Sequence, residues 1–150
     1  MSLVMSVEER EAFLAGLHVA VLSIAGGVDR GPLTVPIWYR YEPGGEVVFV
    51  TGEGSRKTRR LRETGRCSLC VQTEDPPYRY VSVDGPVVAV DRSGLERERR
   101  SIALRYLGAE RGEAYLASST AELDEAVVVR MRPEHWLSAD YGKLRATPAG

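Results

Sequence analysis

The chain has 150 residues and a net charge of −1 at pH 7, with 43% hydrophobic and 27% charged residues. These values are typical of a globular domain with a sizeable core, and the near-neutral charge gives no indication of a nucleic-acid or membrane partner. No apolar run has the length of a transmembrane helix, and the start of the chain lacks a signal-peptide pattern. We therefore expect a single cytoplasmic domain over residues 1–150, with flexible ends at residues 1–5 and 139–150.

The first half of the chain predicts one helix followed by strands. Ser6 and Glu9 have the spacing of a capping box, which predicts a helix that continues to about residue 17. Strands are expected over residues 19–24, 33–41 and 46–51, the last two joined by a hairpin turn at Pro43-Gly44-Gly45. Pro36 cannot donate a ladder hydrogen bond, so its strand should have an edge, a bulge or a ligand at that point.

The second half continues mainly as strands. These are expected over residues 67–73, 81–90 and 126–132, with a bulge or bend at Gly85-Pro86. Ser93 and Glu96 have the spacing of a second capping box, and the helix that follows should end before Gly108. A weaker helix is expected over residues 110–117. About six strands in consecutive hairpins predict a mainly β fold, a closed or nearly closed antiparallel barrel with peripheral helices.

The most informative segment is the basic helix that follows the strand over residues 46–51. Ser55 is its expected N-cap and Gly65 its stop, with the helix running to about residue 64. Its first residues include the cations Arg56, Lys57, Arg59 and Arg60. Because the N-terminus of a helix is itself positive, cations there are unfavourable unless an anion is bound. The placement favours a phosphate site over the alternative of a solvated basic face.

Cys67 and Cys70 have a C-x-x-C spacing, but they lie within an expected strand. Residues three apart in a strand point to opposite faces, so the two thiols should share neither a metal ion nor a disulfide. The chain has no second Cys/His pair to complete a zinc set, so we expect no metal site and two structural cysteines.

Four segments resemble the split-barrel flavin and deazaflavin reductases, the superfamily of pyridoxamine 5′-phosphate oxidase. They are Pro-Leu-Thr-Val-Pro-Ile-Trp-Tyr at 32–39, Val-Phe-Val-Thr at 48–51, Ser-Arg-Lys at 55–57 followed by Arg60-Leu61, and Pro-Tyr-Arg-Tyr-Val-Ser-Val-Asp-Gly at 77–85. The resemblance covers about residues 7–138 in the family's order. The first and last segments are most like the branch that uses the deazaflavin coenzyme F420.

The resemblance implies a six-stranded split β-barrel that forms a homodimer, with two cofactor sites at the subunit interface. The positions that match the family's phosphate-binding segment are Thr51, Ser55, Arg56, Lys57 and Arg60. The positions that match the strand along the tricyclic ring are Leu33, Val35, Pro36 and Trp38, and Tyr80 falls near a further ring-contacting position. No catalytic side chain is implied, because the cofactor carries the hydride chemistry.

Two departures from the oxidase pattern bear on the choice of cofactor. The FMN-using oxidases have an arginine near the position of Val35, where this strand is apolar, and their substrate-binding Arg-x-His is not evident here. We therefore expect an oxidoreductase that binds F420 at the dimer interface and passes hydride to a small unsaturated substrate. The alternatives are an FMN-dependent oxidase or reductase of the same family, and a non-catalytic protein that binds a flavin, a deazaflavin or haem.

Several side chains have two interpretations at this level. Trp38, Tyr78 and Tyr80 could line the pocket or pack in the core or interface. Arg79 could reach the acidic tail of the cofactor or pair with a nearby aspartate. His18 and His135 could donate a proton or bind haem, although capping or packing roles are more usual for such positions.

Overall fold

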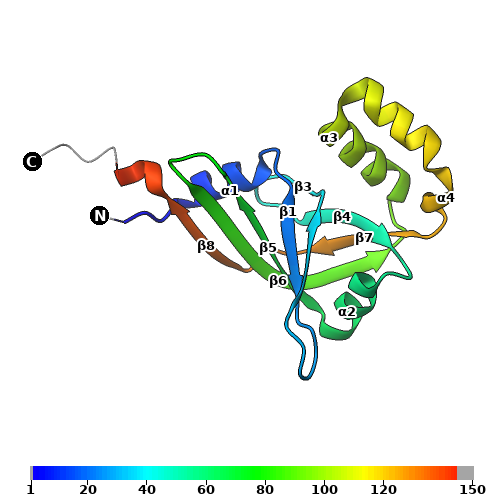
Figure 1. The fold of residues 1–150 in the computed structure, drawn as a ribbon, viewed down its shortest axis with the longest axis horizontal. Helices are drawn as coiled ribbons and strands as arrows, with labels where there is room; N and C mark the ends of the chain where they lie inside the picture. The colour runs from blue at the N-terminus through cyan, green and yellow to red at the C-terminus, as the bar shows by residue number, and fades with distance from the viewer. Residues whose placement is uncertain (1, 145–150) are drawn as a thin grey trace, which may run out of the picture.

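The computed structural model describes residues 2–144, and for residues 122 and 123 the backbone only. Its centre is one antiparallel sheet with the strand order β2-β1-β5-β6-β7-β4-β3, to which β8 is added by pairing with β6 (Figure 1). The strands are β1 (Ala20–Ile24), β2 (Leu33–Ile37), β3 (Arg40–Tyr41), β4 (Val47–Gly52), β5 (Arg66–Gln72), β6 (Arg79–Asp91), β7 (Ala126–Met131) and β8 (His135–Asp140). The helices are α1 (Val7–Ala15), α2 (Arg56–Thr64), α3 (Leu95–Ser118) and α4 (Thr120–Leu123), with a final 3-10 turn at Tyr141–Leu144.

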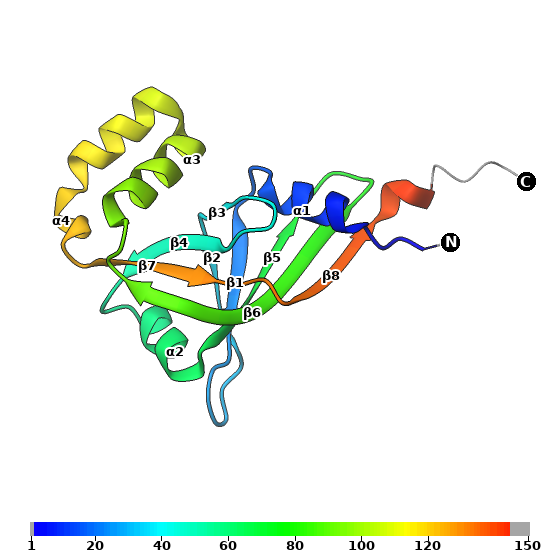
Figure 2. The ribbon, with the colours of Figure 1, turned by 180° about the vertical axis from the view of Figure 1, so that it is seen from behind.

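The long strand β6 joins the two halves of the curled sheet (Figure 2). Its first half pairs with β5 and β8, and its second half pairs with β7. A bulge between Val87 and Ala89 shifts the register, just beyond the expected position at Gly85-Pro86. Gly85 itself is required for packing, because a Cβ there would lie 1.8 Å from the carbonyl oxygen of Arg132. The strand can therefore bend and serve both halves of an antiparallel half-barrel.

The core fills the inside of this curl. Fully buried side chains from β1, β4, β5 and β6 meet there, including Leu22, Phe49, Leu69 and Val83. Helix α1 adds Phe13 and Leu14 to the same cluster, and its capping box, Ser6 with Glu9, is confirmed.

The strand pattern differs from the expected one in two places. The single strand expected over residues 33–41 is interrupted after Ile37, which leaves β2 and the two-residue β3. Strand β8 was not expected, and Ala139 and Asp140 belong to it, where the sequence suggested the start of a flexible tail. Ala139 is buried because it pairs with Tyr80 of β6, a contact that the local sequence does not reveal. Residues 145–150 of that expected tail lie outside the described residues.

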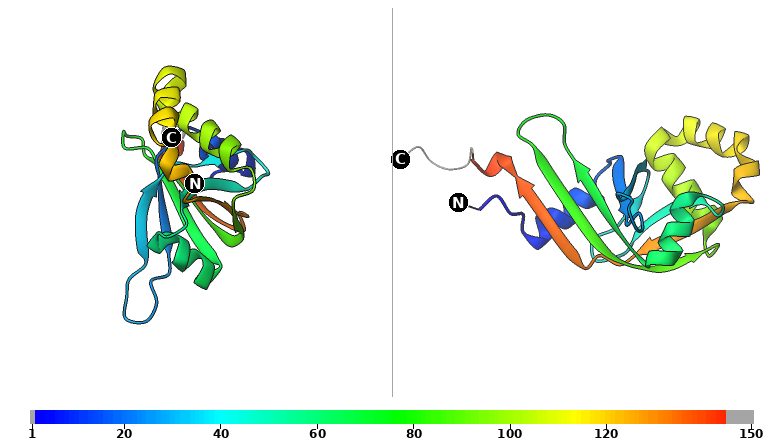
Figure 3. Two further views of the ribbon diagram at one scale, coloured as in Figure 1. Left: turned by 90° about the vertical axis from the view of Figure 1, so that its right-hand side faces the viewer. Right: turned by 60° about the horizontal axis from the view of Figure 1, so that its bottom comes forward.

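Helix α3 is a helical hairpin at the end of the molecule away from α1 and β8 (Figure 3). The chain turns at Gly108, whose positive φ of 81° is readily adopted only by glycine, so the two separate helices of the prediction are confirmed. The second predicted capping box is wrong: Gly94 is the N-cap without a side-chain hydrogen bond, and the Ser93 amide donates to Asp91 instead. Across residues 2–144 the helices are too short or too polar to cross a bilayer.

Both cysteines lie in β5, as the sequence predicts. Cys67 is buried and Cys70 is half-buried, and they occupy alternate faces of the strand. Burial raises the pKa of the Cys67 thiol to about 12 and raises the pKa of Cys70 as well. Both thiols are therefore protonated at neutral pH, which suits structural residues.

Candidate functional site

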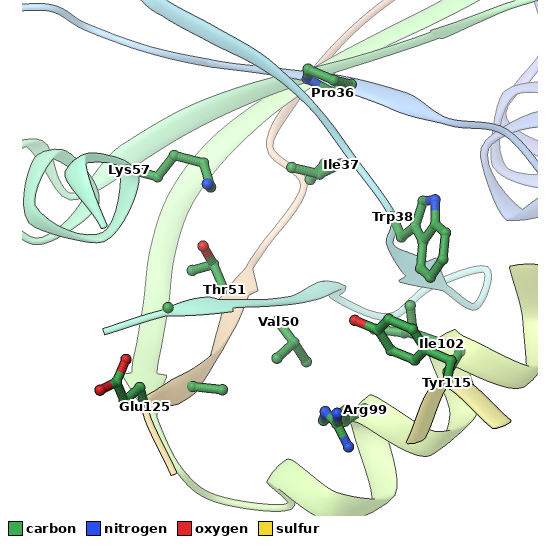
Figure 4. Close-up of a pocket in the computed structure, with 13 residues that line it drawn as sticks. Pro36, Ile37, Trp38, Val50, Thr51, Lys57, Arg99, Ile102, Tyr115 and Glu125 are labelled. Atoms are coloured by element: carbon green, nitrogen blue, oxygen red, sulfur yellow. The ribbon is translucent and has the colours of Figure 1, made fainter. Parts of the chain in front are cut away.

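A pocket of about 450 Å³ lies between strands β2 and β4 and helices α2 and α3 (Figure 4). It is lined by Pro36, Ile37, Trp38, Val50, Thr51, Gly52, Lys57, Arg99, Ile102, Ala103, Tyr115, Glu125 and Ala126. Four of the residues predicted from the sequence are among them, namely Pro36, Trp38, Thr51 and Lys57. The pocket therefore brings together the strand that was expected to contact the cofactor ring and the segment that was expected to bind its phosphate.

The basic helix α2 forms as the sequence predicts. The Thr58 amide donates to the Ser55 hydroxyl at 3.2 Å, and Gly65 ends the helix in the left-handed conformation. The first turn contains no acidic residue. Lys57 projects from this turn into the pocket (Figure 4), and its ammonium group makes no hydrogen bond or ion pair within residues 2–144. A cation at the positive end of a helix with no internal counter-ion is a feature of anion-binding sites.

Three hydroxyl groups hold the turn between β4 and α2. The Thr58 hydroxyl donates to the Gly52 carbonyl at 2.6 Å and lies 3.0 Å from the Ser55 hydroxyl. The Thr51 hydroxyl, at the pocket wall, lies 3.5 Å from that of Ser55. Ser55 thus acts as a cap behind the pocket lining, and this network fixes the turn that presents Lys57.

The arginines of α2 are directed elsewhere. The Arg60 guanidinium donates to the Ala25 carbonyl at 2.9 and 2.6 Å and pairs with Glu63, so it holds the loop after β1. Arg56 is exposed to solvent beside the pocket-facing lysine. Among the described residues, Lys57 is the one cation of this helix that lines the pocket.

Strand β2 supplies the opposite wall. Among the described strands it pairs only with β1, so Pro36 lies in an edge strand, one of the three possibilities inferred from its missing N–H. Trp38 stacks on Tyr106 of α3, with ring centroids 4.9 Å apart and planes 4° apart. Leu33 and Val35 pack against the core and are not part of the lining.

Tyr80 lies in the first half of β6, between Gln72 of β5 and Ala139 of β8. It is not among the residues that line the pocket. Within one chain, Tyr80 therefore lies outside the pocket, although the sequence predicted that it contacts the cofactor ring.

The α3 wall was missed by the sequence analysis. Arg99, Ile102, Ala103 and Tyr115 line the pocket from the two arms of the hairpin. The apolar pair Ile102 and Ala103 had a signal, the buried face of an amphipathic helix, but nothing local indicates which strands this face contacts. Arg99 and Tyr115 are charged or aromatic residues on a helix surface, and the sequence offers no sign that they meet.

The other ambiguous side chains lie away from this pocket. His18 and Arg79 line a separate cavity of about 430 Å³ beside α1. The His18 ring nitrogen Nε2 is 2.9 Å from the Phe13 carbonyl oxygen, and partial burial lowers the pKa of His18. Arg79 lies over the Phe13 ring, at 5.0 Å from its centroid, while Asp84 pairs with another arginine, Arg66. Packing and capping account for the observed contacts of His18.

A curled antiparallel half-barrel with a basic helix start beside an edge strand defines the class of split β-barrel proteins that bind FMN or F420. Within this class, the chain belongs to the pyridoxamine 5′-phosphate oxidase family, whose model matches residues 6–139. The resemblance inferred from the sequence is thus confirmed. No curated protein matches the chain by sequence.

Solved structures support the same fold. The conserved hypothetical protein Rv2991 from Mycobacterium tuberculosis is 26% identical, with a TM-score of 0.79 over 99% of this chain and 92% of that one. An F420 reductase is 21% identical, with a TM-score of 0.69 over 85% of this chain and 94% of that one. An FAD- and haem-binding protein from Mycobacterium smegmatis is 19% identical, with a TM-score of 0.68 over 91% of this chain and 72% of that one.

Proposed function

We propose that this protein is an oxidoreductase that binds F420 in the groove between β2, α2 and α3 and reduces a small unsaturated substrate. The observation that carries this proposal is the Lys57 ammonium group, which faces the pocket at a helix N-terminus without a partner among the described residues. A partly buried positive charge at a helix N-terminus, where backbone N–H groups are left without helical partners, is suited to a phosphate.

The residues present fit such a cofactor. Lys57, Thr51 and the amides of the turn capped by Ser55 would hold the phosphate, with Arg56 at the solvent side. Pro36 and Trp38 offer a flat surface on which a tricyclic ring can lie. The volume of about 450 Å³ is within the usual range for small-molecule sites. The F420 reductase and the FAD- and haem-binding protein with this fold support the general ligand class.

The chain's own residues bind, orient and shield the reactants. When bound, a reduced deazaflavin supplies a hydride, and with a proton from solvent this reduces a C=C or C=N bond while the cofactor is oxidised by two electrons. The pocket wall of Ile37, Val50 and Ile102 excludes water from the reacting atoms. Leu33, Val35, Arg60 and Tyr80 are not part of the proposed site within one chain, because they pack or bond elsewhere.

We also propose that the protein is a homodimer. Cross-strand pairing places Pro36, Val21, Cys70, Ser82 and Leu137 in one row across the outer face of five strands. Val21 is 41% exposed and Leu137 is 63% exposed, so the row is an apolar band open to solvent. Pro36 belongs both to this band and to the pocket lining, so a second copy on the band would lie beside the cofactor groove.

The test is a fluorescence titration of the purified protein with F420 and, in parallel, with FMN, after its absorption spectrum has been recorded. Lys57→Ala should weaken F420 binding about tenfold or more, since a charge-assisted contact is lost. Arg59→Ala removes the same charge from an exposed position of α2 and is the matched control, expected to bind as the wild type does.

Each outcome separates the candidates. A colourless protein that binds F420 in a Lys57-dependent way supports the proposal, and turnover of unsaturated acceptors by the reduced complex completes it. A yellow protein, or a preference for FMN, favours the FMN-dependent alternative. Tight binding with no turnover of any acceptor indicates a non-catalytic carrier, and binding to neither cofactor rejects the proposed function.

A further inference from the structure

The pocket has two cationic ends. Lys57 lies at one end, near α2, and Arg99 lies at the other, with Trp38 and Tyr115 (Figure 4). The cofactor phosphate of the proposed function accounts for the lysine alone. The second end needs a separate explanation. It is formed by Arg99, Trp38 and Tyr115 over the apolar residues Ile102 and Ala103.

The side chain of Arg99 has donors that are not used within the described residues. Its Nη2 atom donates to the Ser119 carbonyl at 2.8 Å and to the Ser119 hydroxyl. Its Nε and Nη1 groups make no hydrogen bond and no ion pair in the part of the chain that the structure describes. The guanidinium is partly buried, so an anionic ligand would meet it with part of its hydration already removed.

One aromatic ring, that of Tyr115, contacts this guanidinium, and the Trp38 ring lies next to Tyr115. The guanidinium lies over the Tyr115 ring at 5.6 Å from the centroid, and the Tyr115 and Trp38 rings are 6.1 Å apart and inclined by 57°. Trp38 is held on its other side by the stack on Tyr106. Beside this fixed indole, a tyrosine that is 37% exposed and an arginine with free donors form a surface for a planar ring that carries a negative group.

We propose that this end of the groove is the acceptor subsite and that it recognises a planar, conjugated carboxylate. The inference rests on the proposed function, since an acceptor must lie next to the cofactor ring along Pro36 and Trp38. In this arrangement Arg99 binds the carboxylate and Tyr115 contacts the conjugated system, next to the cofactor ring on Trp38, while Ile102 and Ala103 exclude water below it.

The structure offers a matched control for Arg99. Arg100 is the next residue of the same helix and also joins the two arms of the α3 hairpin, by pairing with Glu113. It is exposed and does not line the pocket. Arg99→Gln and Arg100→Gln therefore each remove one charge and one side-chain contact between the two arms of the hairpin. Only Arg99→Gln changes the proposed subsite.

The experiment compares 2-naphthoate with its uncharged analogue 2-naphthamide by calorimetric titration of the full chain without cofactor. We expect the carboxylate to bind about tenfold more tightly than the amide. Arg99→Gln should abolish this difference, Arg100→Gln should keep it, and Arg99→Lys should restore part of it. Thermal melting of each variant shows whether the hairpin remains folded.

Equal binding of the two probes by the wild type, or an unchanged preference in folded Arg99→Gln, would overturn the subsite. So would displacement of 2-naphthoate by F420 or FMN, because the Arg99 end would then belong to the cofactor. The result is distinguishable from the test of the proposed function. Lys57→Ala affects cofactor binding and should leave the naphthoate preference intact, so either proposal can fail alone.

Discussion

The Arg40 guanidinium donates to both carboxylate oxygens of Glu98, at 2.8 Å from Nε and 2.9 Å from Nη2. Glu98 is only 2% exposed, and Arg97 and Arg130 lie within 3.4 and 3.8 Å of its carboxylate. This ion pair joins β3, at the end of the sheet, to the first arm of α3. Because the next residue, Arg99, lines the pocket, the pair holds one wall of the candidate site in place.

Glu98→Gln should destabilise the protein by about 3 kcal/mol, because it leaves the partly buried Arg40 guanidinium without its counter-ion. We take the low end of the usual range since the Arg40 side chain is 25% exposed and is partly screened by water. Urea unfolding measures the loss. Glu96→Gln, at an exposed position of the same helix turn, should change stability by less than about 0.5 kcal/mol. Similar stability of the two variants would contradict this account.

The same ion pair predicts an acid-dependent loss of stability. Burial by itself raises the pKa of Glu98, but hydrogen bonds from Arg40 and the charges of Arg130 and Arg97 hold the pKa below its ordinary value of 4.5. A carboxyl whose pKa is lower in the folded than in the unfolded chain stabilises the fold above the unfolded value, and this contribution disappears as the pH falls through the folded pKa. The difference in unfolding free energy between wild type and Glu98→Gln should therefore be constant near neutral pH and shrink below about pH 4.5. A difference that stays constant down to pH 3 would show that the carboxylate charge is not responsible.

Arg60 should prove to be a structural residue. Arg60→Met removes the hydrogen bonds to the Ala25 carbonyl and the ion pair with Glu63, and should lower the unfolding free energy by about 1 kcal/mol. Cofactor affinity should change little, in contrast to Lys57→Ala. Arg59→Met, an exposed neighbour, is the control for the charge. A large loss of cofactor affinity with unchanged stability would instead make Arg60 part of the phosphate site.

Self-association should depend on the apolar band across the sheet. Val21→Arg places a charge in the centre of the row formed with Pro36 and Cys70, and should shift sedimentation from dimer to monomer. Val28→Arg introduces the same side chain at a position that is 90% exposed in the loop after β1, and should leave the dimer intact. A wild-type protein that sediments as a monomer would remove the homodimer proposal.

Local chemistry made several features predictable. Ser6 with Glu9, and Ser55 with Gly65, mark helix ends because capping depends on side chains a few residues away. The turn at Gly108 follows from the backbone freedom of glycine, and the edge position of Pro36 is one of the three possibilities that its missing N–H left open. Two features were not predicted correctly. Ser93 has the spacing of a cap but its amide bonds to Asp91, and β8 was overlooked because its pairing with β6 defines it.

By itself, the sequence determined most of the strands and helices, where the basic helix begins, and the family to which the chain belongs. These depend on short-range periodicity, capping and motif spacing. Only the tertiary structure decided which cation faces the pocket, because Lys57, Arg56 and Arg60 look alike in the sequence and differ only in what lies opposite them. It also placed Arg99 and Tyr115 at the groove and Tyr80 away from it. The physical reason is that the curl of the sheet and the turn at Gly108 bring distant segments together, and no local pattern encodes those contacts.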